Sequence, residues 1–263
     1  MSLFDYAVKL RAEDHRYFHR DGREFQSLSR VRSCIKPHFE SDLLSKGVAK
    51  REGKTQQQVL DEWSAKGKVA TDHGTRVHEA LERYEKTAII LPEDEGLRSM
   101  IIALTSEYKD MYQVHQEVTL YDEEYGIAGT ADHIIETTSH KKSILNIDDY
   151  KTNISKGIYF ENKYKKYLLG PFSHIQDTNY FDYSLQLSCY AYMAENLTGR
   201  KIGTLSIVFI PPHNPLAYRR IPVNYMRMEV QALFKYYKEL KHIKKEEGEV
   251  ISAEELTVIP NFG

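Results

Sequence analysis

Residues 126–153 read GIAGTADHIIETTSHKKSILNIDDYKTN, and two strand-like runs within this segment each carry an acidic residue. Asp132 lies in the first run, and Asp149 and Lys151 lie in the second. Because side chains alternate between the two faces of a strand, Asp149 and Lys151 share one face and Tyr150 takes the other. Asp132 joins them if the two runs pair through the turn TTSHKKS. The segment therefore predicts two carboxylates and an ammonium at the edge of a sheet.

Such a group is typical of a hard-cation site with a charged side chain beside it. Mg²⁺ prefers oxygen ligands, and a protein commonly supplies two carboxylates and a backbone carbonyl to its coordination shell. A bound metal lowers the pKa of water and offsets the charge that builds on a phosphate. Lys151 could orient or deprotonate the attacking water, or stabilise the pentacovalent phosphate; these roles stay open. A short D-x-K pattern also occurs in ordinary edge strands with solvated charges, so the motif alone decides nothing.

The composition indicates a globular protein of a reducing compartment. The 263 residues carry a formal net charge of −2, so local Lys/Arg patches would have to meet any nucleic-acid partner. The two cysteines, Cys34 and Cys189, are too few for a four-thiolate iron–sulfur cluster. No apolar run approaches the ~20 residues of a membrane span, and the first residues lack a signal-peptide core. We expect a soluble, cytoplasmic protein without an iron–sulfur cluster.

Hydrophobic periodicity predicts helices on both sides of a group of three strands. The pattern is helical from residue 37 to residue 68 with a break at REGK (51–54), so Gly53 and Gly67 bracket its second piece. A further helix follows, with Thr71 or Asp72 as its N-cap. Alternating residues then predict a hairpin with the loop DEEYG and a third strand, SILNIDDYKT. A helix ending at Gly199, a buried strand and a long C-terminal helix complete the order.

This order predicts an α/β fold with a mixed central sheet flanked by helices. We expect one domain over residues 1–263, with a core at about 70–212 and a C-terminal helix over 224–248. Residues 1–69 would form a helical N-terminal addition, although FQSLSRVRS at 25–33 reads as a short strand leading into a turn.

Four stretches in this order, HGTRVHEALE, GTADHI, DYKTN and QLSCY, resemble the motifs of the RecB-like branch of the PD-(D/E)XK nuclease superfamily. The resemblance runs from about residue 61 to about residue 210. The upstream stretch SLSRV also resembles the lead-in of phage-encoded members. Four ordered motifs at fitting spacings are more specific than any one of them. The resemblance implies a restriction-endonuclease-like core and a metal-dependent nuclease.

Carried over residue by residue, the resemblance makes Asp132 the acid of the first core motif. Asp149 and Lys151 become the acid and lysine of the second, and the adjacent Asp148 lies on the opposite face and is not assigned. His78, four residues after Gly74, matches a histidine that binds the metal or lies next to it. Taken alone, His78 would more often be a histidine at the edge of the core. Beside the carboxylates, it is a candidate metal ligand.

Further roles follow from the same resemblance. The metal site would also use the backbone carbonyl of Tyr150. Gln186 and Tyr190 match a Q-x-x-x-Y element and lie on one helical face, where they could orient the lysine, the carboxylates or a DNA phosphate. An amphipathic helix that tolerates a glutamine is the alternative. Glu117, on the strand before the hairpin, is a candidate for supporting the ligands or for binding a second metal.

A basic and aromatic run follows Lys151 directly. Ammonium groups contact phosphates, and aromatic rings stack on unpaired bases. The alternative is a solvated loop with a few anchoring aromatic side chains. The candidate nucleic-acid contacts are Lys156, Lys163, Lys165, Lys166 and Tyr164.

Together these features predict a Mg²⁺- or Mn²⁺-dependent DNA exonuclease, of phage or other mobile-element type. It would act on linear or single-stranded DNA ends and leave 5′-phosphates and 3′-hydroxyls, as the resemblance implies. The alternatives are a structure-specific or flap endonuclease with the same core, an inert nucleic-acid-binding subunit, or an RNA substrate. A helicase, single-strand-binding or recombination partner would be a separate chain, and a phage-encoded enzyme would work in the host cytoplasm.

Overall fold

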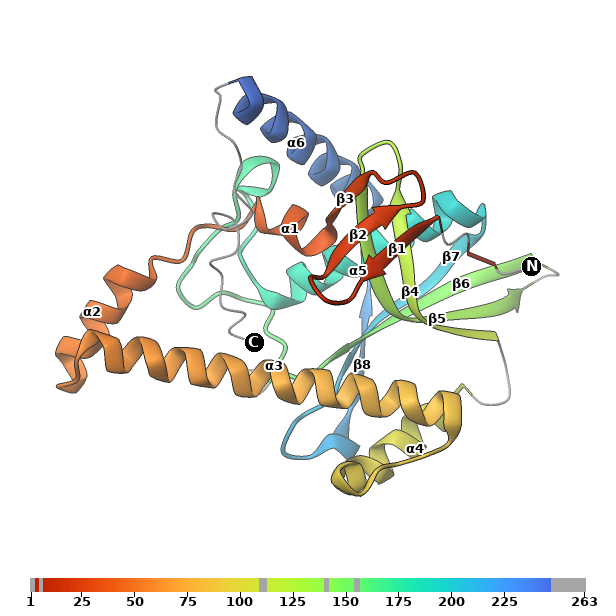
Figure 1. The fold of residues 1–263 in the computed structure, drawn as a ribbon, viewed down its shortest axis with the longest axis horizontal. Helices are drawn as coiled ribbons and strands as arrows, with labels where there is room; N and C mark the ends of the chain where they lie inside the picture. The colour runs from red at the N-terminus through yellow and green to blue at the C-terminus, as the bar shows by residue number, and fades with distance from the viewer. Residues whose placement is uncertain (1–2, 5–6, 109–112, 140–141, 154–156, 247–263) are drawn as a thin grey trace.

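The computed structural model describes residues 3–4, 7–108, 113–139, 142–153 and 157–246 (Figure 1). Its strands are β1 (Val8–Arg11), β2 (Arg16–His19), β3 (Glu24–Ser27), β4 (Gln113–Asp122), β5 (Ile127–Ser139), β6 (Lys142–Lys151), β7 (Lys201–Phe209) and β8 (Arg219–Val223). Its α-helices are α1 (Leu28–Ser33), α2 (Ser41–Glu52), α3 (Gln56–Thr87), α4 (Arg98–Ser106), α5 (Asn179–Thr198) and α6 (Arg227–Glu246). Short 3-10 helices are η1 (Pro92–Leu97), η2 (Gly170–Phe172) and η3 (Pro215–Ala217).

The described strands form one mixed sheet in which β5 has an interrupted edge. β4 pairs antiparallel with β5 along one edge, over residues 127–136 of β5. On the other edge, β3 pairs in parallel with residues 127–128, and β6 pairs antiparallel with residues 133–139. Residues 129–132 therefore face a gap between the ends of β3 and β6. Beyond Asp148, β6 leaves β5 and continues beside β7, to which it is parallel.

Helices cover both faces of this sheet (Figure 1). α3 and α4 pack on one face, where their apolar residues meet Ile135 and Val208. α1, α5 and α6 pack on the other, in a cluster that includes Ile147 and Leu185. None of the helices in the described part of the chain combines the length and apolarity needed to span a bilayer. The arrangement confirms the predicted α/β architecture with a mixed central sheet and flanking helices.

The helix α3 is longer than predicted. It runs without a break through Gly67, Thr71 and Asp72, so the predicted N-cap at Thr71 or Asp72 is wrong. Its N-cap is Thr55, whose hydroxyl accepts from Gln58 N while the Gln58 side chain accepts from Thr55 N. Gly67 does not end the helix because a glycine in a helix interior costs only about 1 kcal/mol relative to alanine. The first half of α3 consequently extends beyond the sheet and packs against α2 (Figure 1).

The N-terminal part of the chain is helical over α2, as expected, but it also contributes strands β1 and β2, which the sequence pattern did not indicate. The segment 25–33 begins as a strand, as predicted, and then becomes α1 instead of a turn. Ser27 makes this switch, because its side chain caps α1 by accepting from Arg30 N. Strand β8 was also not predicted. The helix ends at Gly53 and Gly199 are confirmed, with φ values of 64° and 68°.

A buried acid ties η1 to α3. The Asp94 side chain is 2 % exposed and accepts from Arg76 Nε and from an Arg83 guanidinium nitrogen, both at 2.8 Å. Burial alone would raise the pKa of Asp94, but the two guanidinium groups outweigh it and lower that pKa. A lowered carboxylate pKa means that the group stabilises the fold above its unfolded pKa of about 3.9 and loses this effect as pH falls.

We therefore expect Asp94→Asn to lower the free energy of unfolding by about 2 kcal/mol at pH 7, a value below that for fully buried pairs because both arginines reach solvent. Urea unfolding measures the change. The difference from the wild type should shrink as pH falls below about 4. Asp72→Asn, in an exposed pair with Lys68 on the same helix, is the matched control and should change stability by less than about 1 kcal/mol. Equal effects of the two substitutions on stability would contradict the role given to the ion pairs of Asp94 with Arg76 and Arg83.

Candidate metal centre and active site

The predicted site residues meet at the gap in the edge of β5. Asp132 ends the unpaired stretch of β5, and Asp149 and Lys151 lie on the part of β6 that has left β5. α3 crosses close to the end of β6 because Gly74 has no side chain. A Cβ there would lie 3.2 Å from Thr152 Oγ1, which is tighter than an ordinary contact. The glycine four residues before His78 thus lets the helix deliver the imidazole to the gap.

Three potential metal ligands converge there. One ligand atom each from His78, Glu117 and Asp132 lie within 4.8 Å of one another. His78 Nδ1 is 3.6 Å from Asp132 Oδ2, and its Nε2 is 3.1 Å from the Tyr150 carbonyl oxygen. Tyr150 N donates to Asp132 Oδ2 at 2.9 Å, which replaces the backbone bond lost where β6 leaves β5. The predicted histidine, first acid and carbonyl therefore lie together, with Glu117 beside them.

The hydrogen-bonding pattern of His78 fits a cation at this position. The Tyr150 carbonyl can only accept, so Nε2 carries a proton in this arrangement. In a neutral ring, Nδ1 then presents a lone pair to Asp132 Oδ2, and two acceptors 3.6 Å apart repel each other. A positive charge between imidazole and carboxylate removes the conflict. An imidazole nitrogen, carboxylate oxygens and a backbone carbonyl are a donor set suited to a divalent metal such as Mn²⁺.

Glu117 occupies an unusual backbone conformation. It lies between the pairs Gln116–His133 and Val118–Ala131 of the ladder, opposite Asp132, and its φ is 47°. Non-glycine residues rarely adopt this left-handed region, and such strain persists where surrounding structure enforces it. Desolvation, followed by the charge of Asp132, raises the pKa of the Glu117 carboxyl to about 7. The carboxyl is thus crowded against other acids in a way that a cation would relieve.

Asp149 and Lys151 form a buried ion pair, with exposed side-chain fractions of 2 % and 16 %. Burial raises the pKa of Asp149, and Asp132 adds to this effect against the opposing ammonium. Burial opposes the charge on Lys151, but Asp149 and Asp132 outweigh it and raise the lysine pKa. The ammonium also lies 4.8 Å from the centroid of the Tyr183 ring. Asp149 is not one of the three grouped ligands.

Gln186 and Tyr190 lie behind this pair on α5. Gln186 Nε2 donates to Tyr190 OH at 3.0 Å, as their four-residue spacing on one face allows. Burial, followed by the charge of Asp149, raises the pKa of Tyr190 well above its usual value, so the phenol stays neutral. The space for the ring comes from Gly129 on β5, where a Cβ would lie 2.9 Å from Tyr190 Cε1 and 3.1 Å from Leu28 Cβ.

Gly129→Ala is expected to displace Tyr190 or α1 and to lower the free energy of unfolding by about 1–3 kcal/mol, the usual cost of overpacking. The control is Gly67→Ala, in open space within α3, which should instead stabilise by up to about 1 kcal/mol because alanine favours helix. Chemical denaturation of both variants makes the comparison. An alanine at position 129 without loss of stability would contradict the packing described here.

Sequence reasoning missed a second cationic group beside the site. Arg32, on α1, makes an ion pair with Asp182 Oδ1 at 2.8 Å, and Lys36 Nζ lies 2.8 Å from Asp182 Oδ2. Burial opposes the charge on Arg32, but Asp182 and, more weakly, Asp149 raise its pKa. The two arginines of SLSRVRS were the available signal, but only the packing of α1 brings Arg32 close enough to Asp149 for that charge to raise the arginine pKa.

The acid that the sequence left unassigned has a structural partner instead. Asp148 lies on the opposite face of β6, where Tyr108 OH donates to its Oδ2 at 2.6 Å and Arg220 also bonds to it. His133, the neighbour of Asp132, is buried on that same face, with Nε2 3.3 Å from a Glu85 carboxylate oxygen. Strand alternation therefore places Asp148 and Asp149 on opposite faces of β6.

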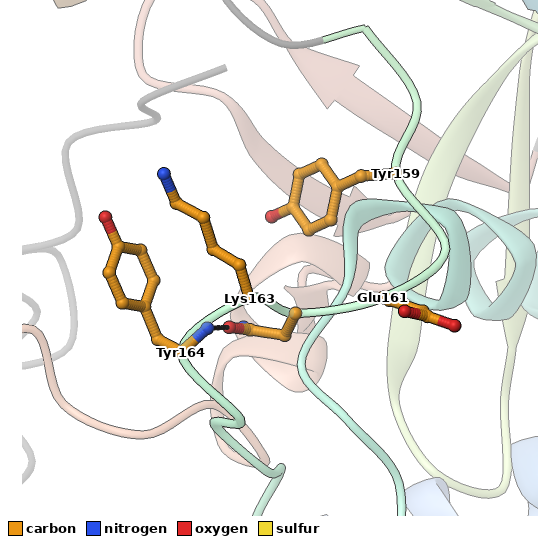
Figure 2. A pocket seen from close by; sticks show the side chains of 5 residues that line it. Tyr159, Glu161, Lys163 and Tyr164 are labelled. Atoms are coloured by element: carbon orange, nitrogen blue, oxygen red, sulfur yellow. Dashed lines mark hydrogen bonds between the residues drawn. The ribbon is translucent and has the colours of Figure 1, made fainter.

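The predicted nucleic-acid segment continues from the end of β6. Lys163, Lys165 and Lys166 are exposed, and Tyr164 is 69 % exposed. Lys156 lies outside the described residues. Tyr159, Glu161, Asn162, Lys163 and Tyr164 line a hollow of about 280 Å³ (Figure 2). The structure thus presents cations and an aromatic ring to solvent on the segment that leaves the catalytic strand.

Comparisons with known proteins leave the family open. No family model matches the chain, and no curated protein matches it. Among solved structures, a protein of Eubacterium rectale called "Putative exonuclease" is 14 % identical with a TM-score of 0.38, over 69 % of this chain and 68 % of that one. A structure called SSO0001 is 17 % identical with a TM-score of 0.30, over 71 % and 82 %. Similarities this distant carry no argument about function, which must come from the site itself.

Proposed function

We propose that this protein is a divalent-metal-dependent nuclease that acts as an exonuclease on DNA. The observation that carries the proposal is the convergence of ligand atoms from His78, Glu117 and Asp132 within 4.8 Å of one another. They meet at the gap where β6, which carries the Asp149–Lys151 pair, leaves β5. An isolated acid pair or a lone histidine would be ordinary. Ligand atoms from three separate elements that converge beside the Asp149–Lys151 pair are difficult to explain as chance surface charge, because the carboxylates repel each other unless a cation lies between them.

His78, Asp132 and Asp149 would hold Mg²⁺ or Mn²⁺, with Glu117 as a further ligand. The Tyr150 carbonyl accepts from the opposite nitrogen of the His78 ring, so it would join the ligands only if that ring turned. When bound, the metal supplies a water of lowered pKa and offsets negative charge on the phosphate. The site has the oxygen-rich donors that these cations prefer. The Tyr150 N–H bond to Asp132 fixes the carboxylate.

The protein's own cations would act on the phosphate. Lys151 is paired with a carboxylate and therefore carries its proton, so it is suited to stabilise negative charge on the reacting phosphate. The Tyr190 phenol and the Gln186 amide lie behind it and would keep the pair in position. Arg32, anchored on Asp182, would bind a phosphate oxygen next to the reacting one, because a guanidinium offers several donors in a fixed plane.

The preference for DNA ends rests on the resemblance of the motifs and on the exposed lysines and Tyr164 after β6. Hydrolysis would leave 5′-phosphates and 3′-hydroxyls. The test uses linear DNA labelled separately at each end, and a covalently closed circle, in Mg²⁺, Mn²⁺ or EDTA. We expect metal-dependent loss of the linear DNA and an intact circle, with the labels giving the polarity. Cleavage of the circle would favour an endonuclease, and no cleavage of either DNA would contradict the proposed activity.

A further inference from the structure

We propose that the hollow lined by Tyr159, Lys163 and Tyr164 binds one unpaired base of single-stranded DNA, and thereby makes the enzyme select single-stranded ends over blunt duplex ends. This inference rests on the proposed nuclease function and names the substrate class of that site. Tyr159 and Tyr164 lie on opposite sides of the hollow with Lys163 between them, while Glu161 points away (Figure 2).

The size and chemistry of the hollow fit a single base. Its volume of about 280 Å³ lies just below the ~300 Å³ at which pockets for drug-sized ligands begin, so it admits one planar ring system rather than a run of bases. Lys163 Nζ lies over the Tyr164 ring, 4.9 Å from its centroid. This exposed, flexible side chain would leave the ring face when a base stacks there and would then contact a phosphate beside that base. Bases in a duplex have their faces covered by neighbours, so only an unpaired base can stack there.

Hydrogen bonds hold the walls of the hollow in place. The Asn179 side chain, at the start of α5, donates to Gly157 O at 2.7 Å and accepts from Tyr159 N at 2.8 Å. Asn162 Nδ2 donates to Asp177 O at 2.6 Å. A segment with its backbone bonded in this way is preformed, so a ligand does not have to order it.

The same bonds connect the hollow to the catalytic lysine. Lys151 lies over the Tyr183 ring, and Tyr183 OH donates to Asn153 Oδ1 at 2.9 Å. Asn153 Nδ2 in turn donates to Gly157 O at 3.1 Å, two residues before Tyr159. A strand whose base occupies the hollow is therefore held by the segment that leads directly from the active site.

Binding without cleavage isolates this inference. Fluorescence anisotropy in EDTA compares a labelled oligothymidine with a blunt duplex. Tyr164→Ala is expected to weaken binding of the single strand by about 5- to 150-fold, the range for one stacked base, and to leave duplex binding unchanged. Tyr164→Phe keeps the ring and should bind like the wild type. Lys163→Ala should lower the slope of log K against log salt by about 0.7, because one phosphate contact is lost.

Tyr167→Ala is the matched control, because Tyr167 is also an exposed tyrosine of this segment but does not line the hollow. An equal loss in Tyr164→Ala and Tyr167→Ala would overturn the inference, as would single-strand binding that is unchanged in Tyr164→Ala or absent in the wild type. The cleavage assay separates the two proposals. Metal-dependent cleavage without Tyr164-dependent binding would support the nuclease function and contradict the base-binding hollow. Tyr164-dependent binding without cleavage would support the hollow and contradict the nuclease function.

Discussion

Replacing Lys151 with alanine is expected to slow metal-dependent cleavage by about 10²- to 10³-fold, the usual effect of removing one group that stabilises charge in the transition state. The ammonium is the buried cation next to the carboxylates, and its pairing with Asp149 keeps it charged. Substrate binding should change much less, because the exposed lysines after β6 remain. Single-turnover cleavage at saturating enzyme measures the effect on the chemical step.

The control for this substitution is Lys235→Ala, which removes an exposed lysine on α6. It should leave cleavage unchanged. Because Lys151→Ala leaves Asp149 buried without its partner, the variant is also expected to lose stability. Lys151→Met retains most of the buried aliphatic volume, and a thermal melt confirms which variants are folded at the assay temperature. A folded Lys151 variant with wild-type turnover would contradict the role given to this lysine.

Asp132→Asn is expected to abolish tight binding of Mn²⁺ and, with it, cleavage. An amide oxygen can still accept from Tyr150 N, so the local hydrogen bond is retained while the negative charge is lost. We expect at least a ~100-fold increase in the dissociation constant, because even residues that only support metal ligands cost 10- to 100-fold when they are changed. Isothermal titration with Mn²⁺ gives the constant directly.

The matched control for Asp132 is Asp72→Asn, which removes an exposed acid from α3 and should bind Mn²⁺ like the wild type. A second readout is thermal. Mn²⁺ at 100 times the wild-type dissociation constant should add about 2.7 kcal/mol to wild-type stability and at most about 0.4 kcal/mol to Asp132→Asn. Equal stabilisation of both proteins would place the metal elsewhere.

The central strands, and the faces on which the candidate site residues lie, were predictable because strand alternation fixes side-chain direction. That rule alone placed Asp149 and Lys151 on one face and Asp148 on the other, and the structure agrees. The helix ends at Gly53 and Gly199 were also predictable, because glycine readily adopts the left-handed backbone conformation that commonly ends a helix.

The remaining features depend on long-range pairing, which no local pattern reveals. β3 pairs only with residues 127–128 of β5, and this short pairing leaves the gap before β6. It also places α1, which carries Arg32 and follows β3 directly, next to that gap. The positive φ of Glu117 likewise follows from its place opposite Asp132 in the ladder. The uninterrupted α3 shows the limit of local signals, since Gly67, Thr71 and Asp72 favour a helix boundary only when packing does not oppose it.

The most direct test of the metal centre is a crystal structure of the protein with Mn²⁺, in which anomalous scattering locates the ion. We predict a peak between His78 Nδ1 and Asp132, within roughly 2.0–2.6 Å of an Asp132 carboxylate oxygen. Glu117 or Asp149 should complete the ligand set. A crystal saturated with Mn²⁺ that shows no peak at this position, or one only at other carboxylates, would contradict the assignment of this site as a metal centre.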